Sequence, residues 1–264
     1  DARIIVMGCY ATRAADEIAG LPGVWRVLTD KSQLPDLLLE MGLDSPVGGI
    51  TTFGERHRAY IKVQDGCRQR CAYCIIPTVR PELKSRSVAD VEAEVRGLVE
   101  AGFREIVLTG IHLGHYGVDF TEAVETSSSG ERSMRLHDLV KRLIALDGDF
   151  RLRLSSLEAV EVTDELVELV RDNPARVCPH FHLSMQSGSD DVLQRMRRRW
   201  MSGPFIERCG EIRRQLDLPA LTTDIIVGFP GETDADFAET MRLVETVGYA
   251  SAFSFKYSPR PGTP

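Results

Sequence analysis

The sequence predicts an α/β protein in which a partial (β/α)6 barrel follows part of a smaller α/β domain. Three observations support this prediction. Short β-like runs alternate with helix-like segments from residue 60 onward, a stretch rich in glycine and proline precedes them at 44–58, and the first fifty residues have a strand–helix–strand pattern of their own. Strands that alternate with helices form βα units with a parallel sheet and right-handed crossovers.

The barrel prediction rests on six β-like runs and on the helical segments between them. The expected strands are Tyr60–Gln64, Glu105–Thr109, Arg151–Ser155, His180–Met185, Thr222–Val227 and Ala252–Tyr257. The expected helices, which have apolar residues at three- and four-residue spacing, are Val88–Ala101, Leu136–Leu146, Thr163–Arg171, Pro204–Leu216 and Ala235–Val247. Function in such barrels lies on the loops that follow the strands, so the loop after the first strand is the expected site of chemistry.

Alternation along these strands predicts a polar lumen. Successive side chains of a barrel strand point in turn to the lumen and to the surrounding helices. On the first strand, Ile61 and Val63 are expected to face the helices and Gln64 the lumen; on the last, Phe253 and Phe255 are expected on the helix side. A lumen lined by charged and amide groups, in place of branched apolar ones, suits a polar ligand.

The first fifty residues predict part of a separate domain. Arg3–Gly8 and Trp25–Leu28 have the composition of strands, and Ala11–Ala19 has that of a helix. The expected domain limits are 1–50 for this part, 51–58 for a linker and 59–264 for the barrel. The chain opens directly into an apolar run and stops in a turn rich in proline and glycine, so we expect a fragment of a longer protein.

Composition places the chain among ordinary globular proteins, with 43% hydrophobic and 27% charged residues. It contains no apolar run long enough for a transmembrane helix, so we expect no membrane partner. No secretory signal pattern opens it, which favours a cytoplasmic location. The net charge of −7 argues against nucleic-acid binding driven by overall charge, although a local basic patch can still bind phosphates.

Three cysteines in one short loop carry most of the chemical information. Cys67, Cys71 and Cys74 form a C-x-x-x-C-x-x-C motif directly after the first barrel strand. Three thiolates are one short of closing a four-iron cluster, so one iron would keep an open coordination position for a substrate or cofactor. Zinc fingers usually show two separated pairs of ligands. A three-cysteine zinc site completed by a remote histidine, and three unligated thiols, remain as alternatives.

The residues around this loop resemble those of a known family. The string from Gln64 to Pro77 is similar to the cysteine loop of the radical S-adenosylmethionine enzymes, and most similar to their methylthiotransferase branch. Further matching segments are Ser85–Ser87, Leu108–Gly114, Arg153–Glu158, Gln186–Asp190, Thr223–Thr233 and Tyr257–Thr263. The resemblance implies a radical-SAM partial barrel, preceded by the carboxy-terminal part of the methylthiotransferase amino-terminal domain.

Within that branch, the stretches Cys178–Leu183, Met196–Trp200 and His112–Gly117 are most similar to the members that act on N6-threonylcarbamoyladenosine beside the tRNA anticodon. Sister members act on isopentenyladenosine in tRNA or on an aspartate of a ribosomal protein. A fragment that binds a cluster and S-adenosylmethionine without catalysis is a further alternative. The resemblance therefore implies a tRNA anticodon loop as the partner.

The resemblance implies radical chemistry and two clusters. Cys67, Cys71 and Cys74 would hold a [4Fe-4S] cluster whose open iron binds S-adenosylmethionine. One electron, from a donor such as flavodoxin or ferredoxin, would then yield a 5′-deoxyadenosyl radical that removes the hydrogen from carbon 2 of the adenine, where a methylthio group is added. Cys9 matches the third ligand of the second [4Fe-4S] cluster, and its other two cysteines are expected upstream of Asp1.

The resemblance also implies contacts with the cofactor. Tyr73 is expected beside the adenine, while Thr109 and Gly110 end the second strand, where the superfamily recognises the amino group. The residues expected near the ribose or the methionyl group are Ser155, Glu158 and Gln186. For each of these residues, plain packing, a turn or a local hydrogen bond is the alternative.

A second group of residues is assigned to RNA. Arg195 and the run Arg197, Arg198, Arg199 and Trp200 form the strongest basic and aromatic cluster of the chain. Arginine on phosphates and an aromatic ring on a base would suit an anticodon loop, and a solvated helix end is the alternative.

Other polar and sulfur-bearing residues are expected to be structural. Arg153 and Asp224 are expected either to pair across the lumen or to bind ligand, and Cys178 and Cys209 to be buried. Of the histidines, only His182 is considered for a ligand contact.

Overall fold

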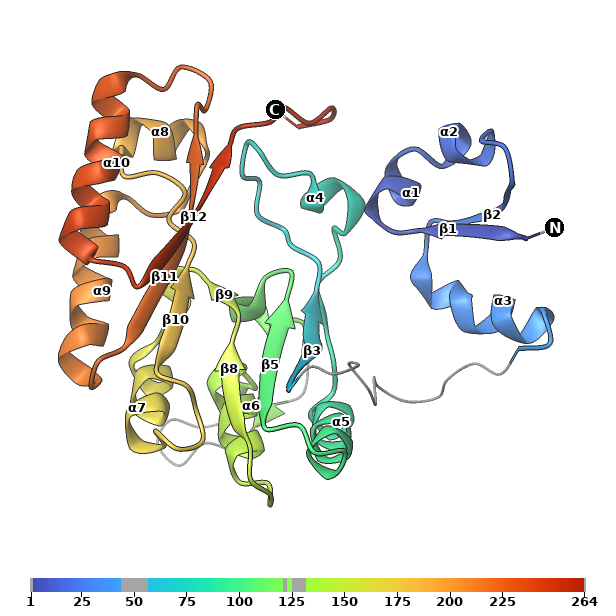
Figure 1. Ribbon diagram of the computed structural model, residues 1–264, viewed down its shortest axis with the longest axis horizontal. Helices are drawn as coiled ribbons and strands as arrows, with labels where there is room; N and C mark the ends of the chain where they lie inside the picture. The colour runs from blue at the N-terminus through green and yellow to red at the C-terminus, as the bar shows by residue number, and fades with distance from the viewer. Residues whose placement is uncertain (1, 44–56, 121–122, 125–131, 264) are drawn as a thin grey trace.

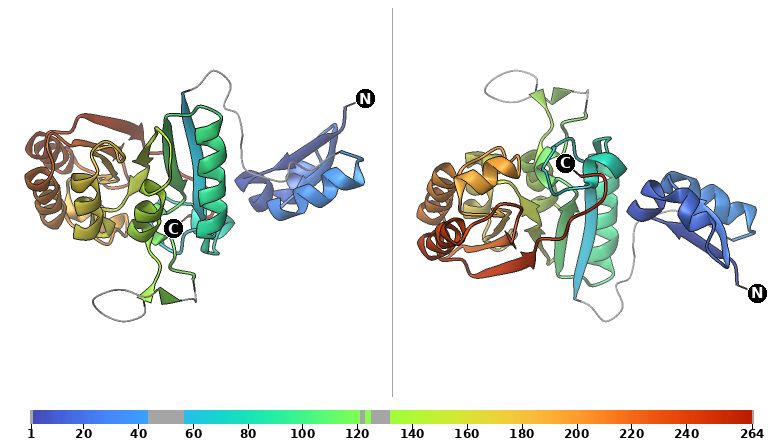
Figure 2. Two further views of the ribbon diagram at one scale, coloured as in Figure 1. Left: turned by 90° about the horizontal axis from the view of Figure 1, so that it is seen from below. Right: turned by 90° about the horizontal axis from the view of Figure 1, so that it is seen from above.

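A curved sheet of parallel strands with helices on its outer side forms the larger part of the molecule (Figures 1 and 2). The computed structural model describes residues 2–43, 57–120, 123–124 and 132–263. The parallel strands are β3 (Arg58–Asp65), β5 (Glu105–Gly110), β8 (Arg151–Leu154), β9 (Ser156–Leu157), β10 (His180–Leu183), β11 (Ala220–Val227) and β12 (Ser251–Lys256). The order β3-β5-β8 continues through the adjacent β9 into β9-β10-β11-β12, and β4 (Lys84–Ser85) pairs antiparallel with β3. The predicted partial barrel is confirmed.

Amphipathic helices cover the outer face of this sheet (Figure 2). They are α5 (Val88–Glu100), α6 (Leu136–Ile144), α7 (Asp164–Asp172), α9 (Ser202–Gln215) and α10 (Asp234–Val247), which agrees with the predicted spans. In α5, Val91, Val95 and Leu98 recur at helical spacing and are buried in the same core as Ile61 and Val63 of β3. None of the described helices is long and apolar enough to cross a membrane.

Short elements fill the connections at the ends of the strands. They are α4 (Ile76–Val79), η2 (Leu113–His115), β6 (Ala123–Val124), β7 (Arg132–Ser133), η3 (Ala159–Glu161) and α8 (Asp190–Arg195). Of these, α4, η2, η3 and α8 follow β3, β5, β9 and β10 in the chain. They therefore lie at the carboxyl ends of the strands, where barrels place their sites.

The amino-terminal part is a small α/β unit beside the barrel (Figure 1). It consists of β1 (Ile4–Met7), α1 (Cys9–Arg13), α2 (Ala15–Ala19), β2 (Val24–Leu28), η1 (Lys31–Gln33) and α3 (Leu34–Glu40), with β1 and β2 parallel. The single helix predicted at 11–19 is divided because Ala14 leaves the helical region, with φ −131° and ψ 48°. Most of the predicted linker at 51–58 lies outside the described residues, and the predicted domain limits remain a prediction.

The lumen is polar where the alternation predicts it, except along β12. Ile61 and Val63 are fully buried on the helix side, and Gln64 lies on the opposite face. The prediction for β12 is wrong: Phe253 pairs in register with Asp224 and its ring lies 6.4 Å from that of His182, so it faces the lumen. All six residues of this edge strand are exposed. Because neither face of the strand is buried, the alternation of apolar and polar residues does not show which face points to the lumen.

An ion network lies at the amino ends of β3, β5 and β8. Glu105 accepts contacts from Arg58 (2.5 Å), Arg151 (2.7 Å) and Arg153 (2.7 Å) beside a cavity of about 760 Å³. Burial alone opposes ionisation, but the hydrogen bonds from Arg153 and Arg151 lower the pKa of Glu105 to about 2. The pairing of Arg153 with Asp224 considered from the sequence does not occur, because Asp224 lies 3.2 Å from Nε2 of His182.

Replacing Glu105 with glutamine is expected to lower the free energy of unfolding at pH 7 by about 1–3 kcal/mol, because three arginines lose their carboxylate while water screens the two exposed ones. A carboxyl whose pKa is lowered by folding stabilises the protein above its ordinary pKa, 4.5 for glutamate, and that contribution is lost as the pH falls towards about 2. Denaturant unfolding between pH 7 and pH 3 measures this. A difference between wild type and Glu105→Gln that does not shrink below pH 4.5 would contradict it.

Candidate active site

The cysteine loop follows β3 and is held in place by backbone hydrogen bonds. The amide of Cys67 donates to the carbonyl of Arg80 (3.1 Å), and the amide of Ala72 donates to the carbonyl of Met196 after α8 (2.9 Å). Gln64, at the end of β3, is 1% exposed and connects the loop to the next strand. Its Nε2 donates to the carbonyl of Gly66 (2.9 Å), and its Oε1 accepts from the amide of His112 after β5 (2.8 Å).

The three thiols of this loop lie within one electrostatic environment. Cys67, Cys71 and Cys74 are free cysteines that are partly or fully buried. Burial raises the pKa of the Cys74 thiol, and the neighbouring Cys71 and Cys67 raise it further. Thiols so placed gain from sharing a metal centre, which removes their protons and neutralises their charges.

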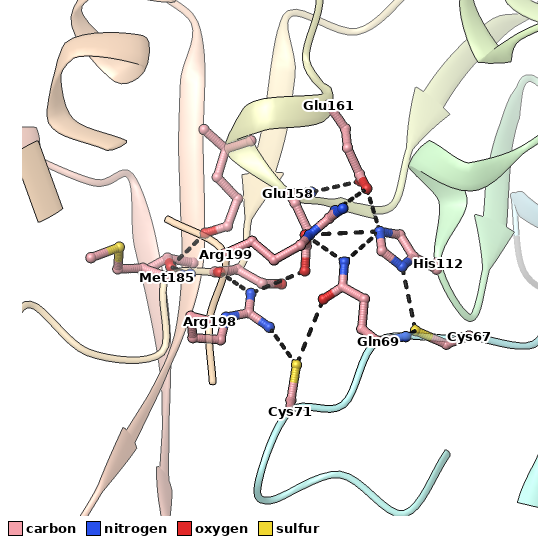
Figure 3. A network of polar contacts seen from close by, with 12 residues as sticks. Cys67, Gln69, Cys71, His112, Glu158, Glu161, Met185, Arg198 and Arg199 are labelled. Carbon is pink, nitrogen blue, oxygen red and sulfur yellow. Dashed lines mark hydrogen bonds and ion pairs between the residues drawn. The ribbon is translucent and has the colours of Figure 1, made fainter. Parts of the chain in front are cut away.

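A network of acidic and basic side chains surrounds two of the sulfurs (Figure 3). Arg198 donates from Nη1 to Sγ of Cys71 (3.2 Å), and its Nη2 lies 3.3 Å from Oε1 of Glu158. Gln69, inside the loop, donates to Oε2 of Glu158 (2.7 Å). Arg199 pairs with Glu158 (2.8 Å) and with Glu161 (3.1 Å). The η3 turn therefore holds both arginines against the cysteine loop.

His112 connects Glu161 of the η3 turn to Cys67 of the cysteine loop. Its Nδ1 lies 3.4 Å from Sγ of Cys67 and its Nε2 lies 2.5 Å from Oε1 of Glu161. Burial alone would lower the pKa of His112, but the contacts with Cys67 and Glu161 raise it to about 9. The sequence alone predicts no role for this residue. It lies in two of the matching segments, Leu108–Gly114 and His112–Gly117, and the turn after β5 brings it to Cys67.

His112, His115 and Glu161 also form a possible donor set for a metal ion, because their ligand atoms lie within 4.8 Å of one another. The two imidazole rings are stacked at 3.7 Å and 13°, and the Nε2 atoms of both already face Oε1 of Glu161, at 2.5 Å and 3.4 Å. Arg199 already neutralises Glu161. Both features favour a hydrogen-bonded network over a separate metal site.

The structure brings some of the predicted cofactor residues to the loop and leaves others in local contacts. Glu158 lies in the network, and Tyr73 receives a hydrogen bond from Arg198 (3.1 Å). The hydroxyl of Thr109 donates to the carbonyl of Ile61 (3.3 Å). The remaining three sit at strand ends: Gly110 lies against Gln64, Ser155 donates its amide to Leu108, and Gln186 has φ 76° and bridges to β11.

The residues assigned to RNA do not form one surface. Trp200 is 3% exposed and its ring stacks on Arg198, whose guanidinium carbon lies 4.0 Å from the ring centroid. This burial arises because α8 ends at Arg195 and the left-handed turn at Arg197 (φ 56°) directs the following residues inward. The assignment of Arg198 and Trp200 to RNA stays a prediction. Arg199 is half exposed but paired with acids, and Arg197 is exposed.

The other cysteines lie apart from this loop or at its edge. Cys178 and Cys209 are buried, as predicted. Cys9 begins α1, which packs against α4, and Arg80 lies between Cys9 and Asp65. Arg80 is also the residue whose carbonyl accepts from Cys67, so it connects the amino-terminal unit to the cysteine loop.

Comparisons with known proteins identify relatives of this sequence and fold. The model of the radical SAM superfamily matches residues 61–244. The chain is 39% identical over its full length to "Threonylcarbamoyladenosine tRNA methylthiotransferase MtaB" of Thermotoga maritima, of which it covers 61%. Over 79% of its length it is 39% identical to "tRNA-2-methylthio-N(6)-dimethylallyladenosine synthase" of Corynebacterium jeikeium, of which it covers 40%. The chain thus spans about 60% of the length of the curated relatives that match it from end to end.

The fold has solved counterparts as well. The cobalamin-dependent S-adenosylmethionine radical enzyme OxsB superposes with a TM-score of 0.64 at 13% identity, over 92% of this chain and 39% of that one. Such a likeness, at low identity, concerns the architecture of the barrel.

Proposed function

This chain belongs to the radical SAM superfamily, and from that premise we propose that it is the catalytic part of a methylthiotransferase that modifies tRNA. The observation that carries the proposal is the loop of three interacting thiols at the carboxyl end of β3, bordered by a buried network of charge. The family implies a [4Fe-4S] cluster and S-adenosylmethionine as cofactors. We assign the cluster to Cys67, Cys71 and Cys74.

The residues present fit this group. Three soft thiolate donors and one missing ligand suit a cluster with an open corner, which supplies a one-electron reductive cleavage of S-adenosylmethionine when both are bound. Arg198 is almost fully buried beside Cys71, and its Nε has no hydrogen-bond partner among the described residues. A buried donor without a partner is costly, so a carboxylate of the bound cofactor is a suitable acceptor for it.

Other residues of this chain would orient the cofactor. Tyr73 packs with Phe229, Met196 and Ile226 in a small apolar cluster beside the cysteine loop, which offers a surface for an adenine ring. We propose that the amino group, ribose and methionyl group of S-adenosylmethionine are contacted by Thr109, Gly110, Ser155, Glu158 and Gln186. On the inner face of β10 and β11, His182 and Asp224 offer polar groups to a substrate.

For the substrate we propose N6-threonylcarbamoyladenosine in the anticodon loop of a tRNA, methylthiolated at carbon 2. This choice is supported by relatives of that name that match the chain over its full length, whereas the dimethylallyladenosine relatives match 79% of it or less. Dimethylallyladenosine is the second candidate substrate. Arg197 remains available for RNA phosphates.

We further propose that Cys9 is one ligand of a second cluster, the other two being supplied by the longer protein. Its position at the start of α1, next to Arg80 and the cysteine loop, would place a sulfur donor near the first cluster. An electron donor such as flavodoxin or ferredoxin would supply the reducing electron.

The test uses the full-length protein with both clusters reconstituted under anaerobic conditions. It is incubated with S-adenosylmethionine, dithionite and two tRNAs, one carrying each modified adenosine, and the nucleosides are analysed by mass spectrometry. We expect a methylthio mass increase on threonylcarbamoyladenosine alone. An increase on dimethylallyladenosine alone would identify that nucleoside as the substrate instead. Unchanged nucleosides with both clusters loaded would contradict the proposed methylthiotransferase activity.

A further inference from the structure

We propose that Glu161 and His112 form a positioning pair that holds a hydrogen bond on the sulfur of Cys67 and thereby raises the reduction potential of the cluster. The proposal rests on the assignment of Cys67 as a cluster ligand. The role of His112 requires no direct contact with substrate or cofactor. It acts through the ligand sulfur.

The geometry fixes both ends of the imidazole. A carboxylate oxygen of Glu161 lies 2.5 Å from Nε2, and the sulfur of Cys67 lies 3.4 Å from Nδ1. Nδ1 thus faces the sulfur and Nε2 faces the carboxylate, and the tautomer with its proton on Nδ1 donates to the sulfur. The side chain of His112 is 6% exposed, which keeps water from competing for either contact.

The surrounding chain is built to hold Glu161 in place. Oε2 of Glu161 accepts from the amide of Glu158 (3.3 Å) and Oε1 lies near Arg199 (3.1 Å). Gly114 gives the carboxylate its room, because a Cβ at that position would lie 2.0 Å from Oε2 of Glu161. The amide of His112 is fixed in turn by Gln64. Backbone and side chain of the histidine are therefore both constrained.

A hydrogen bond to a ligand sulfur favours the reduced cluster, which carries one more negative charge on iron and sulfur. The step concerned is the gain of one electron by the cluster, supplied by dithionite or by the natural donor. Without the donor on Cys67 the cluster is harder to reduce. Its potential then moves to a more negative value, while its iron content stays the same.

The test compares the reconstituted wild-type protein with His112→Phe, Glu161→Gln and the matched control His115→Phe. His115 stacks on His112 and touches Glu161 (3.4 Å), and among the described residues it contacts no cysteine sulfur. Iron content is measured first, followed by a redox titration monitored by electron paramagnetic resonance. We expect His112→Phe to reduce the ratio of reduced to oxidised cluster at a fixed potential by about tenfold, equivalent to ~59 mV for one electron.

The possible results distinguish the positioning role of His112 from the assignment of the cluster to the three cysteines. Glu161→Gln is expected to shift the potential in the same direction by a smaller amount, and His115→Phe to leave it unchanged. If His112→Phe does not bind iron, the reduction potentials of Glu161→Gln and His115→Phe are compared instead, and a more negative potential in Glu161→Gln alone supports the positioning role. Equal potentials in loaded wild type, Glu161→Gln and His112→Phe would overturn the positioning role, whereas a wild-type protein that binds no iron would overturn the cluster assignment itself.

Discussion

Replacing Cys74 with alanine in this 264-residue chain is expected to lower the iron bound after anaerobic reconstitution from about four atoms per chain to less than one, and to abolish reductive cleavage of S-adenosylmethionine. Two thiolates cannot hold three corners of a four-iron cluster. Cys74 is the most informative of the three, since the contacts of Cys67 and Cys71 with His112 and Arg198 would add structural effects to the loss of a ligand. Iron analysis and the visible absorption spectrum measure the result.

Cys209→Ala is the matched control. Cys209 lies on α9, is 2% exposed and packs in the apolar core of the barrel, where burial raises the pKa of its thiol to about 12. Its removal should cost about 1 kcal/mol in the free energy of unfolding and leave the iron content unchanged. Cys74→Ala that still binds four irons, or iron loss of equal size in both variants, would contradict the ligand assignment. Zinc bound in place of iron would favour the alternative of a three-cysteine zinc site, with His112, 3.4 Å from the sulfur of Cys67, as the fourth ligand.

Gly66→Ala is expected to cost about 2–4 kcal/mol in the free energy of unfolding and to prevent cluster assembly. Gly66 has φ +79°, and a Cβ there would lie 1.7 Å from the carbonyl oxygen of Glu82. The backbone of the segment after α4 must therefore move, and with it the hydrogen bond that anchors Cys67 to Arg80. Denaturant unfolding and iron content are the two measurements.

The control for this substitution is Gly97→Ala in the exposed part of α5. A Cβ at Gly97 meets no atom within 4 Å, and the helix gains about 0.5–1 kcal/mol when alanine replaces glycine. The two variants should thus change stability in opposite directions. Gly66→Ala with unchanged stability and full iron binding would show that the loop tolerates a side chain at this position, contrary to the geometry.

The barrel and the cysteine loop could be predicted because their signals are local. Ile61 and Val63 alternate with polar neighbours along β3, and helical spacing marks Val91, Val95 and Leu98 of α5. The cysteine spacing likewise lies within eight residues of sequence. Each of these features depends on residues that are close in the chain.

The parts that could not be predicted depend on long-range placement. His112 meets Cys67 across 45 positions, through a turn whose direction the sequence does not reveal. The run from Arg197 to Trp200 has the composition of an RNA-binding surface, but a single left-handed residue turns Arg198 and Trp200 into the interior. The face of Phe253 could not be predicted, because β12 is an exposed edge strand without a buried side.

The central claim is that Cys67, Cys71 and Cys74 hold a four-iron cluster with one open iron that binds S-adenosylmethionine. The most direct measurement is the electron paramagnetic resonance spectrum of the reconstituted, dithionite-reduced protein, recorded without and with S-adenosylmethionine. In this 264-residue chain we expect a signal from a reduced four-iron cluster that changes shape when the cofactor binds, and that is missing in Cys74→Ala. A loaded cluster whose spectrum is the same with and without S-adenosylmethionine would contradict it.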